Sequence, residues 1–204
     1  MRERPIRGLC GARCIRCRTH LDACVCDVIA TLPTLRSPSR IHLLLHLSEG
    51  RKSTNTGWLA TTLLGGAVHA VGRDLPEPAL PDDALLLTPD ASRTLREDDA
   101  GRPLLVLDAA WRPARRLRRK LHTLHTRDTV ALPESLVHER GYALRHDARE
   151  SHLATAEAIA LALGILGAPE TERALLTLFA AFVERGLRVR GLPRTPTLNP
   201  STAR

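Results

Sequence analysis

The chain has 204 residues, of which 43% are apolar and 25% charged, a composition that fits one globular domain with a small appendage and excludes an intrinsically disordered chain. No apolar run reaches the length of about 18 residues that a membrane span needs, and the N-terminus lacks the apolar segment of a secretory signal. We therefore expect a cytoplasmic protein with no membrane partner, whose cysteines are reduced or metal-bound. The net charge of +8 favours a polyanionic partner such as nucleic acid, although near-exclusive use of Arg also fits a GC-rich genome.

All five cysteines lie between residues 10 and 26, and four of them form two closely spaced pairs. Two residues separate Cys14 from Cys17, and one residue separates Cys24 from Cys26. Four thiolates suit a tetrahedral Zn²⁺ site, which can hold together a short segment that lacks a core of its own. We predict a zinc-binding module over residues 1–32 with these four thiolates as ligands.

The fifth cysteine permits a second interpretation. The spacing Cys10-x3-Cys14-x2-Cys17 matches that of radical enzymes that combine S-adenosylmethionine with an iron–sulfur cluster. This interpretation leaves the other two cysteines unexplained, and the chain that follows is too short for the large barrel of such enzymes. Zinc therefore accounts for the cluster better.

Hydrophobic patterning predicts strands alternating with helices over residues 38–190. We expect strands at 40–47, 67–71, 84–88, 103–107 and 129–132. We expect helices at 56–64, 91–96, 111–124, 152–166 and 169–184, and a polar loop at 48–55. Phe179 and Phe182 lie on an apolar stripe of the last helix and are expected in the core. The alternation predicts an α/β fold with a mainly parallel sheet, and residues 191–204 are expected to be a disordered tail.

Polar or aromatic residues follow three of the predicted strands. In α/β proteins, ligands bind at the carboxyl ends of the strands, so these residues are candidates for one site. Each signal is weak by itself, because a polar residue at a strand end can simply cap the next helix. The candidates are Glu49, Asn55, Thr56 and Gly57 after the first strand, Pro89 and Asp90 after the third, and Asp108 with Trp111 after the fourth.

The helix that begins at Trp111 is densely basic. Its arginines are expected to hold RNA phosphates, as are the arginines of the cysteine module. The alternative is a solvated basic face. The candidate RNA-binding residues of the helix are Arg112, Arg115, Arg116 and Arg119.

The order of these motifs resembles that of the DTW-domain family, whose members are tRNA-uridine aminocarboxypropyltransferases. The resemblance covers about residues 14–167. It rests on the two cysteine pairs, His46-x2-Glu49, Asn55-Thr56-Gly57, Asp108-x2-Trp111, Tyr142-x2-Arg145 and Thr155-x-Glu157-Ala158. One position departs from the family pattern Asp-x-Thr/Ser-Trp, because Ala110 stands where a hydroxyl is expected.

The resemblance implies a relative of the SPOUT fold with a C-terminal trefoil knot around the S-adenosylmethionine site. It also implies transfer of the 3-amino-3-carboxypropyl group of S-adenosylmethionine to N3 of a uridine in tRNA, with 5′-methylthioadenosine as the by-product. Thr155 and Glu157 join the strand-end residues as expected cofactor-binding residues. Arg145 is expected to contact RNA or the cofactor carboxylate, or to form only a surface salt bridge.

Two roles are open for Asp108. It is either the base that polarises or removes the N3 proton, or a ligand of the amino group or ribose hydroxyls of S-adenosylmethionine. Trp111 is expected to pack on the cofactor or its sulfonium, a cation–π contact of about 1 kcal/mol, with simple packing under the helix as the alternative.

Two other function classes remain open at this point. A SPOUT-type RNA methyltransferase would use the same donor but a different carbon. A non-catalytic, zinc-bearing RNA-binding protein would bind RNA without transfer, and Ala110 favours this class mildly. A monomer is the favoured oligomeric state.

Overall fold

The computed structural model describes residues 12–137 and 153–191 of the chain. Its strands are β1 (Ile41–His46), β2 (Ala67–Val71), β3 (Leu85–Leu87), β4 (Leu104–Asp108) and β5 (Thr129–Val130). Its α-helices are α1 (Cys26–Thr31), α2 (Leu47–Gly50), α3 (Thr56–Leu63), α4 (Trp111–Lys120), α5 (Glu134–Val137), α6 (Thr155–Ile165) and α7 (Pro169–Val189). Short 3₁₀ turns lie at η1 (Leu21–Ala23), η2 (Glu97–Asp99) and η3 (His122–Leu124).

The five strands form one sheet in the order β2-β1-β4-β3-β5, and every pair of neighbours is parallel. The central pair is β1 and β4, in which Leu45 lies opposite Asp108. β3 and β4 are runs of Leu and Val up to Asp108, the pattern of parallel strands that are covered on both faces. The predicted α/β fold with a parallel sheet is confirmed.

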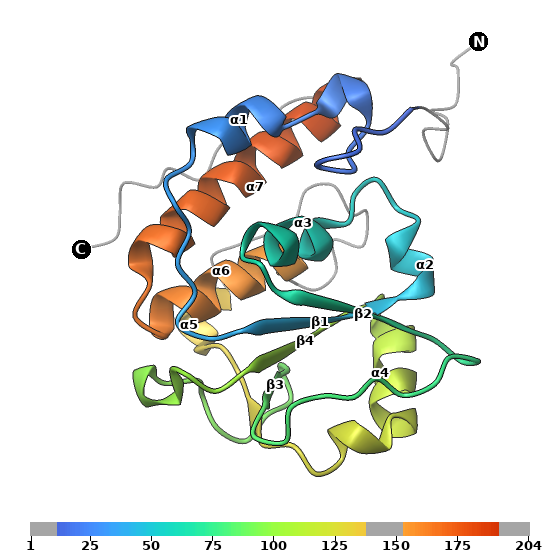
Figure 1. The fold of residues 1–204 in the computed structure, drawn as a ribbon, viewed down its shortest axis with the longest axis vertical. Helices are drawn as coiled ribbons and strands as arrows, with labels where there is room; N and C mark the ends of the chain where they lie inside the picture. The colour runs from blue at the N-terminus through green and yellow to red at the C-terminus, as the bar shows by residue number, and fades with distance from the viewer. Residues whose placement is uncertain (1–11, 138–152, 192–204) are drawn as a thin grey trace.

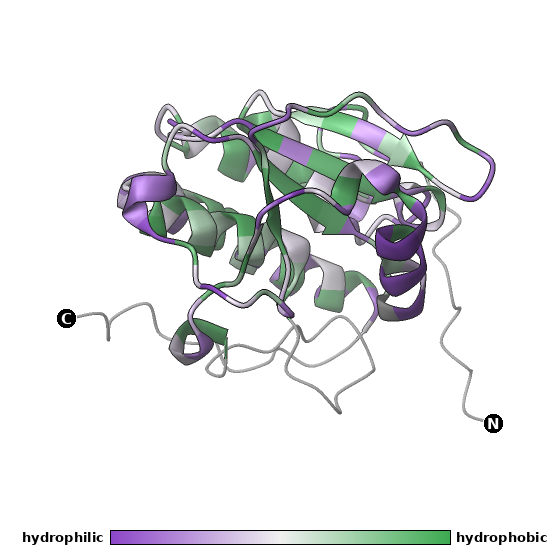
Figure 2. Cartoon of the chain, turned by 90° about the horizontal axis from the view of Figure 1, so that it is seen from below, coloured by the Kyte–Doolittle hydropathy of each residue, from purple (hydrophilic) through white to green (hydrophobic). Residues whose placement is uncertain are grey.

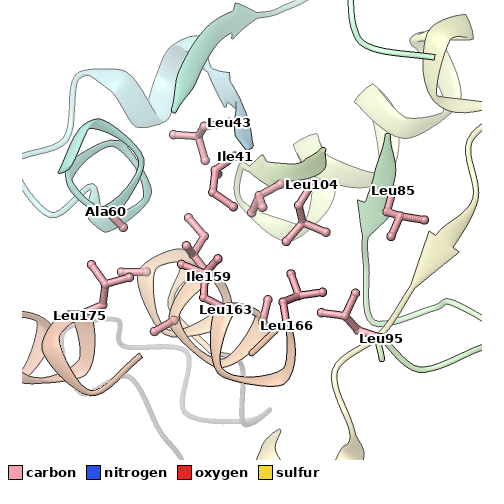
Figure 3. Close-up of a cluster of buried hydrophobic side chains, with 14 of the residues drawn as sticks. Ile41, Leu43, Ala60, Leu85, Leu95, Leu104, Ile159, Leu163, Leu166 and Leu175 are labelled. Atoms are coloured by element: carbon pink, nitrogen blue, oxygen red, sulfur yellow. The ribbon is translucent and has the colours of Figure 1, made fainter. Parts of the chain in front are cut away.

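Successive side chains of the central strands enter two different cores, because side chains alternate between the faces of a sheet. Ile41 and Leu43 of β1 pack with α3, α6 and α7, and Figure 3 shows them facing Ala60 and Ile159. Leu44 points to the opposite face, where the cluster includes Leu117 of α4. Figure 1 accordingly shows α4 well separated from the α6–α7 pair. The sheet therefore has a helical layer on each face.

The cysteine-rich segment packs against the helical layer. Cys17, Val25 and Ile29 share a buried cluster with Leu59 of α3 and with Phe182 of α7. Figure 1 shows α1 lying along α7. Apolar side chains of this segment are thus buried against the main domain.

One ion pair reinforces this contact. The Arg185 guanidinium of α7 donates to both carboxylate oxygens of Asp27, at 2.6 and 2.7 Å. These hydrogen bonds lower the pKa of Asp27 to about 2. The same guanidinium donates to the backbone oxygen of Cys24, which links α7 directly to the cysteine cluster.

Four predictions about local structure were wrong, and one of them is the end of the last helix, which lies at Val189 rather than at residue 184. No helix forms at 91–96, because Thr94 pairs with Ala131 as an extension of the sheet and the chain then turns through η2. The expected loop at 48–55 contains part of α2. The basic helix ends at Lys120 rather than at residue 124.

Other predictions held or fall outside the described ranges. The strand at 67–71 has the predicted bounds, and Phe182 is buried with Phe179 packed beside the core. The predicted tail falls almost wholly on residues 192–204, outside the described part of the chain. Within the described ranges, no helix is both long and apolar enough to cross a bilayer.

Candidate functional site

The carboxyl ends of β1 and β4 meet at the centre of the sheet. The chain leaves β1 toward α3 on one face and leaves β4 toward α4 on the other face. A parallel sheet opens at such a switch point, where the two connections diverge, and ligands bind there. Asp108, the last residue of β4, occupies this position.

Asp108 joins three segments that are far apart in the sequence. Its side chain is buried, with 2% of the residue exposed. Asn55 Nδ2 donates to Asp108 Oδ2 at 2.7 Å, and Thr155 Oγ1 donates to Asp108 Oδ1 at 3.0 Å. Because both oxygens accept a hydrogen bond, the carboxylate holds the start of α3 and the start of α6 against the end of β4.

Gly57 allows this close approach. A Cβ atom at this position would lie 2.5 Å from Asp108 Oδ2 and 2.8 Å from Thr155 Cγ2. A second contact lies beside it, where the backbone N–H of Ala156 donates to Thr56 Oγ1 at 3.3 Å. The residues predicted to form one site from the segments at 55–57, 108 and 155–157 are therefore brought together.

Asn55 and Glu157 also act as helix caps. Asn55 Oδ1 accepts from the backbone N–H of Trp58 at 2.8 Å, so one side chain caps α3 and donates to Asp108. Glu157 is buried, and its Oε2 accepts from the backbone N–H of Ala154 at 2.9 Å. This contact is the reciprocal half of a capping box and satisfies an N–H at the start of α6. The predicted contact of Glu157 with the cofactor stays a prediction.

The structure shows what the residue at position 110, where the sequence departs from the family pattern, does at the start of α4. Ala110 is the N-cap of α4, and no side chain caps the helix there. Ser and Thr are strongly preferred at this position because their hydroxyl accepts from a free backbone N–H. The missing hydroxyl is thus a missing helix cap directly before Trp111, the first residue of α4.

The basic helix presents its predicted RNA-binding arginines to solvent. Arg112, Arg115, Arg116 and Arg119 are exposed. Figure 2 shows α4, at the right, as a strongly hydrophilic helix.

Arg118 differs from these arginines because it turns back toward the sheet. It pairs with Asp90 at 2.8 Å and donates to Thr88 Oγ1 at 3.3 Å. Pro89, another predicted site residue, is exposed in the turn between these two partners. The ion pair fixes α4 to the loop that follows β3.

Glu49, one of the polar residues that follow the first predicted strand, is a buried carboxylate near the end of β1 for which no ligand contact was predicted. It is completely buried, and Lys52 Nζ lies 2.6 Å from its Oε1. A buried carboxylate is stable only when it is paired or hydrogen-bonded. The burial of Glu49 was not predicted, because residues 48–55 were expected to form a polar loop.

The four predicted metal ligands form a second centre. The thiol sulfurs of Cys14, Cys17, Cys24 and Cys26 all lie within 4.8 Å of one another. Two sulfur pairs are closer, at 3.5 Å for Cys14 and Cys26 and 3.8 Å for Cys17 and Cys24. A tetrahedral zinc ion with Zn–S bonds of about 2.3 Å separates its sulfurs by about 3.8 Å. The donors and their spacing therefore fit Zn²⁺.

The backbone around the first cysteine pair favours a thiolate. Backbone N–H groups of Cys17 and Arg16 point at the Cys14 sulfur and lower the pKa of Cys14 to about 6. Burial and the neighbouring sulfurs raise the pKa of Cys26 instead. A metal ion would relieve this difference, since coordination deprotonates all of its thiol ligands.

Three residues named in the sequence prediction lie outside the described part of the chain. Tyr142 and Arg145 fall within 138–152, and Cys10 falls within 1–11. The predicted contact of Arg145 with RNA or with the cofactor carboxylate therefore stays a prediction.

Comparison with known families decides the classification. A model of the DTW domain matches residues 11–187, which include the four thiols and all five strands. The chain belongs to the DTW domain family. The match confirms the resemblance that the ordered motifs indicated, and Asp108 and Trp111 stand at the acidic and aromatic positions that name the family.

Among solved structures, the DTW domain resembles the SAM-dependent rRNA acp-transferase Tsr3 from Vulcanisaeta distributa. The two chains are 21% identical, with a TM-score of 0.50 over 74% of this chain and 81% of that one. This likeness supports a shared fold. No curated protein matches the chain in sequence.

Proposed function

We propose that the protein transfers the 3-amino-3-carboxypropyl group of S-adenosylmethionine to N3 of a uridine in tRNA. One observation carries the proposal: three separate motifs of the family meet at the Asp108 carboxylate, at the switch point of a parallel sheet. A set of short motifs with purely local roles in folding would not need to converge on one ligand-binding edge.

The reaction is a displacement at the γ-carbon of the donor. The N3–C bond forms while the C–S⁺ bond breaks, the sulfur keeps the electron pair, and the N3 proton leaves to a base or to water. The products are the modified uridine and 5′-methylthioadenosine. A sulfonium activates three carbons, so the site must select among them by placing the γ-carbon in line with N3.

Two helices start at the Asp108 carboxylate, and a third, α4, starts three residues beyond it at Trp111. Helix N-termini carry unpaired N–H groups and a partial positive charge, which suit a carboxylate such as that of the donor's amino acid. The residues proposed to hold the donor are Asn55, Thr56, Gly57, Pro89, Asp108, Trp111, Thr155 and Glu157.

Between the two roles left open for Asp108, its contacts favour that of a ligand-binding and positioning group. Asn55 and Thr155 hold the buried carboxylate as an acceptor of hydrogen bonds. A further donor from the ligand, an ammonium or a ribose hydroxyl, fits the same acceptor. A base must instead offer a lone pair to N3 in the transition state and accept its proton.

The exposed arginines of α4 are proposed to bind phosphates beside the site, because α4 starts directly after the β4 end that carries Asp108. A second candidate is ribosomal RNA, since the similar structure is that of an rRNA acp-transferase. The proposal also includes a relationship to the SPOUT fold and its trefoil knot. Such a knot would involve the segment before α6, and residues 138–152 of that segment are outside the described part of the chain.

A dual-label assay tests the proposal. The protein is incubated with unmodified bulk tRNA, or with rRNA, and with S-adenosylmethionine labelled either in the methyl group or in the carboxyl group. The carboxyl label should enter the RNA and the methyl label should not. Entry of the methyl label would establish an RNA methyltransferase instead. Binding of RNA without binding of S-adenosylmethionine would establish a non-catalytic protein.

A further inference from the structure

The turn that carries the first cysteine pair is closed by a residue with an unusual backbone. Arg18 has a φ of 58°, and it is the one residue other than glycine with a positive φ in the described part of the chain. Its backbone N–H donates to the carbonyl oxygen of Cys14 at 2.9 Å, which completes the turn around Cys14 and Cys17. This left-handed conformation is unstrained for glycine but strained for arginine. An arginine in such a conformation indicates that its side chain has a role.

The Arg18 side chain extends from the module to the main domain. Its guanidinium carbon lies 4.1 Å from the centre of the Trp58 ring, a cation–π contact. Trp58 is the third residue of α3, and it packs both against the main core and against the cluster that contains Cys17. Arg18 and Trp58 therefore connect the cysteine turn to the first turn of α3.

The first turn of α3 in turn holds the amide that contacts Asp108. The backbone N–H of Trp58 donates to Asn55 Oδ1 at 2.8 Å, and Asn55 Nδ2 donates to Asp108 Oδ2 at 2.7 Å. The approach is close, since a Cβ atom at Gly57 would lie 2.5 Å from Asp108 Oδ2. A displacement of this turn therefore either reorients the Asn55 amide or presses the helix against the carboxylate.

We propose that Arg18 and Trp58 are positioning residues of the donor site. The guanidinium on the indole fixes the first turn of α3, and this turn orients Asp108 through Asn55. The cysteine module thereby contributes to the binding of S-adenosylmethionine without touching it. The inference rests on the proposed function for the identity of the donor, and it extends that function by giving the module a part in donor binding.

Arg18→Gly is the central variant. It removes the guanidinium and leaves a residue that adopts a φ of 58° without strain, so the cysteine turn should still form. Arg18→Lys keeps a cation that can reach the ring. Trp58→Leu keeps an apolar side chain in the core but removes the aromatic face.

Arg173→Gln is the control for the loss of one positive charge. Arg173 is exposed on α7, and its Nε donates within the same helix to the carbonyl oxygen of Pro169 at 3.4 Å. Metal content and melting temperature are measured for every variant to show that it is folded.

The affinity for S-adenosylmethionine is measured by calorimetry. Arg18→Gly should raise the dissociation constant about threefold, the effect expected from the loss of an exposed cation–π contact. Trp58→Leu should raise it at least as much, Arg18→Lys less, and Arg173→Gln not at all. The double variant of Arg18→Gly and Trp58→Leu should bind no more weakly than Trp58→Leu alone, because both changes remove the same contact.

Hydrogen exchange over residues 55–60 gives a second readout that needs no donor. Exchange should be faster in Arg18→Gly and in Trp58→Leu than in the natural protein, and unchanged in Arg173→Gln. Faster exchange together with weaker donor binding would establish that the contact positions α3 for the donor.

The outcomes separate this inference from the proposed function. If the natural protein binds S-adenosylmethionine and Arg18→Gly binds it equally well, the inference is overturned and the proposed function stands. Fully additive effects of the two changes, or weaker RNA binding with unchanged donor affinity, would also overturn it, the latter by making Arg18 a phosphate contact. If the natural protein does not bind S-adenosylmethionine, the proposed function fails and the positioning role for the donor fails with it.

Discussion

Asn55 Nδ2 lies 2.7 Å from Asp108 Oδ2, while Oδ1 of the same amide caps α3 through the backbone N–H of Trp58. One side chain thus connects the end of β4 to the start of α3. Both halves of an amide are needed for this connection, because one end donates and the other accepts.

Substitution of Asn55 should therefore have an effect that depends on pH. Asn55→Asp keeps the capping oxygen but places a second carboxylate against Asp108, and two carboxylates at this distance resist joint ionisation. The free energy of unfolding should fall by about 1–3 kcal/mol at neutral pH and recover partly near pH 4, where one carboxyl can hold a proton. Urea denaturation at several pH values measures this. Asn55→Ala loses the cap and the donor together and should show no such recovery, so equal pH profiles for the two variants would contradict the arrangement.

Gly57→Ala should disturb the site through its size. The new Cβ would lie 2.5 Å from Asp108 Oδ2, so the carboxylate or α3 must move, at a cost of about 1–3 kcal/mol. Binding of S-adenosylmethionine, measured by calorimetry, should weaken in parallel. Gly50→Ala is the control, because the nearest atom to a Cβ there is 3.5 Å away. Wild-type stability and donor binding in Gly57→Ala would show that the close approach does not matter.

Ala110→Ser should restore the missing cap of α4. A serine hydroxyl at the N-cap stabilises a helix by about 0.5–2 kcal/mol, and Ala110 has no such contact. The melting temperature should rise, and transfer activity should be at least as high as that of the natural protein. A drop in stability would mean that the N-cap has no room for the hydroxyl.

Zinc removal should loosen the cysteine module and the surface of α7 that it covers. The thiols fit a tetrahedral ion, and the segment shares a buried cluster with Phe182. Treatment with a chelator should release about one zinc ion per chain, and hydrogen exchange should rise over residues 12–32 and at the end of α7. The strands should keep their protection. Release of iron in place of zinc, or no metal at all, would contradict the assignment.

The stacked pair His42 and His69 should make stability depend on pH in a separate window. Their ring nitrogens lie 3.1 Å apart, and burial, joined for His42 by the charges of His69 and Arg40, lowers the pKa of both imidazoles. Because the folded-state pKa lies below the unfolded value of about 6.5, the unfolded chain binds more protons, and stability falls as the pH drops below about 6.5.

Replacement of the buried member tests this dependence. His42→Leu should flatten the change in unfolding free energy between pH 6.5 and pH 5. The carboxyls with lowered pKa, among them Asp27, Glu77 and Asp99, lose their contribution only in more acidic solution. An unchanged slope would show that the pair does not govern this window.

Elements whose structure depends on neighbouring residues were predicted correctly from the sequence. The strands are short apolar runs, Asn55 caps α3, and the spacing of the four cysteines implies their cluster. The meeting of Asn55 with Asp108 was predicted from the strand ends. The part of Thr155 was anticipated only through the order of known motifs, because Thr155 reaches Asp108 across 47 positions of the chain.

The failures came from contacts between distant residues. A helix was predicted at 91–96, but Asp90, just before it, pairs with Arg118 of α4, and Thr94 extends the sheet beside Ala131. The packing of the cysteine module on α7 likewise depends on Asp27 and Arg185, which are 158 positions apart. No pattern in a single segment carries such information.

Identification of the by-product tests the central claim most directly. Purified protein, unmodified tRNA and S-adenosylmethionine are incubated, and the adenosine product is separated by chromatography for the natural protein and for Asp108→Asn. We predict 5′-methylthioadenosine, formed in step with the aminocarboxypropyl nucleoside, and almost none of it from the variant. Formation of S-adenosylhomocysteine, or full activity of Asp108→Asn, would contradict the account.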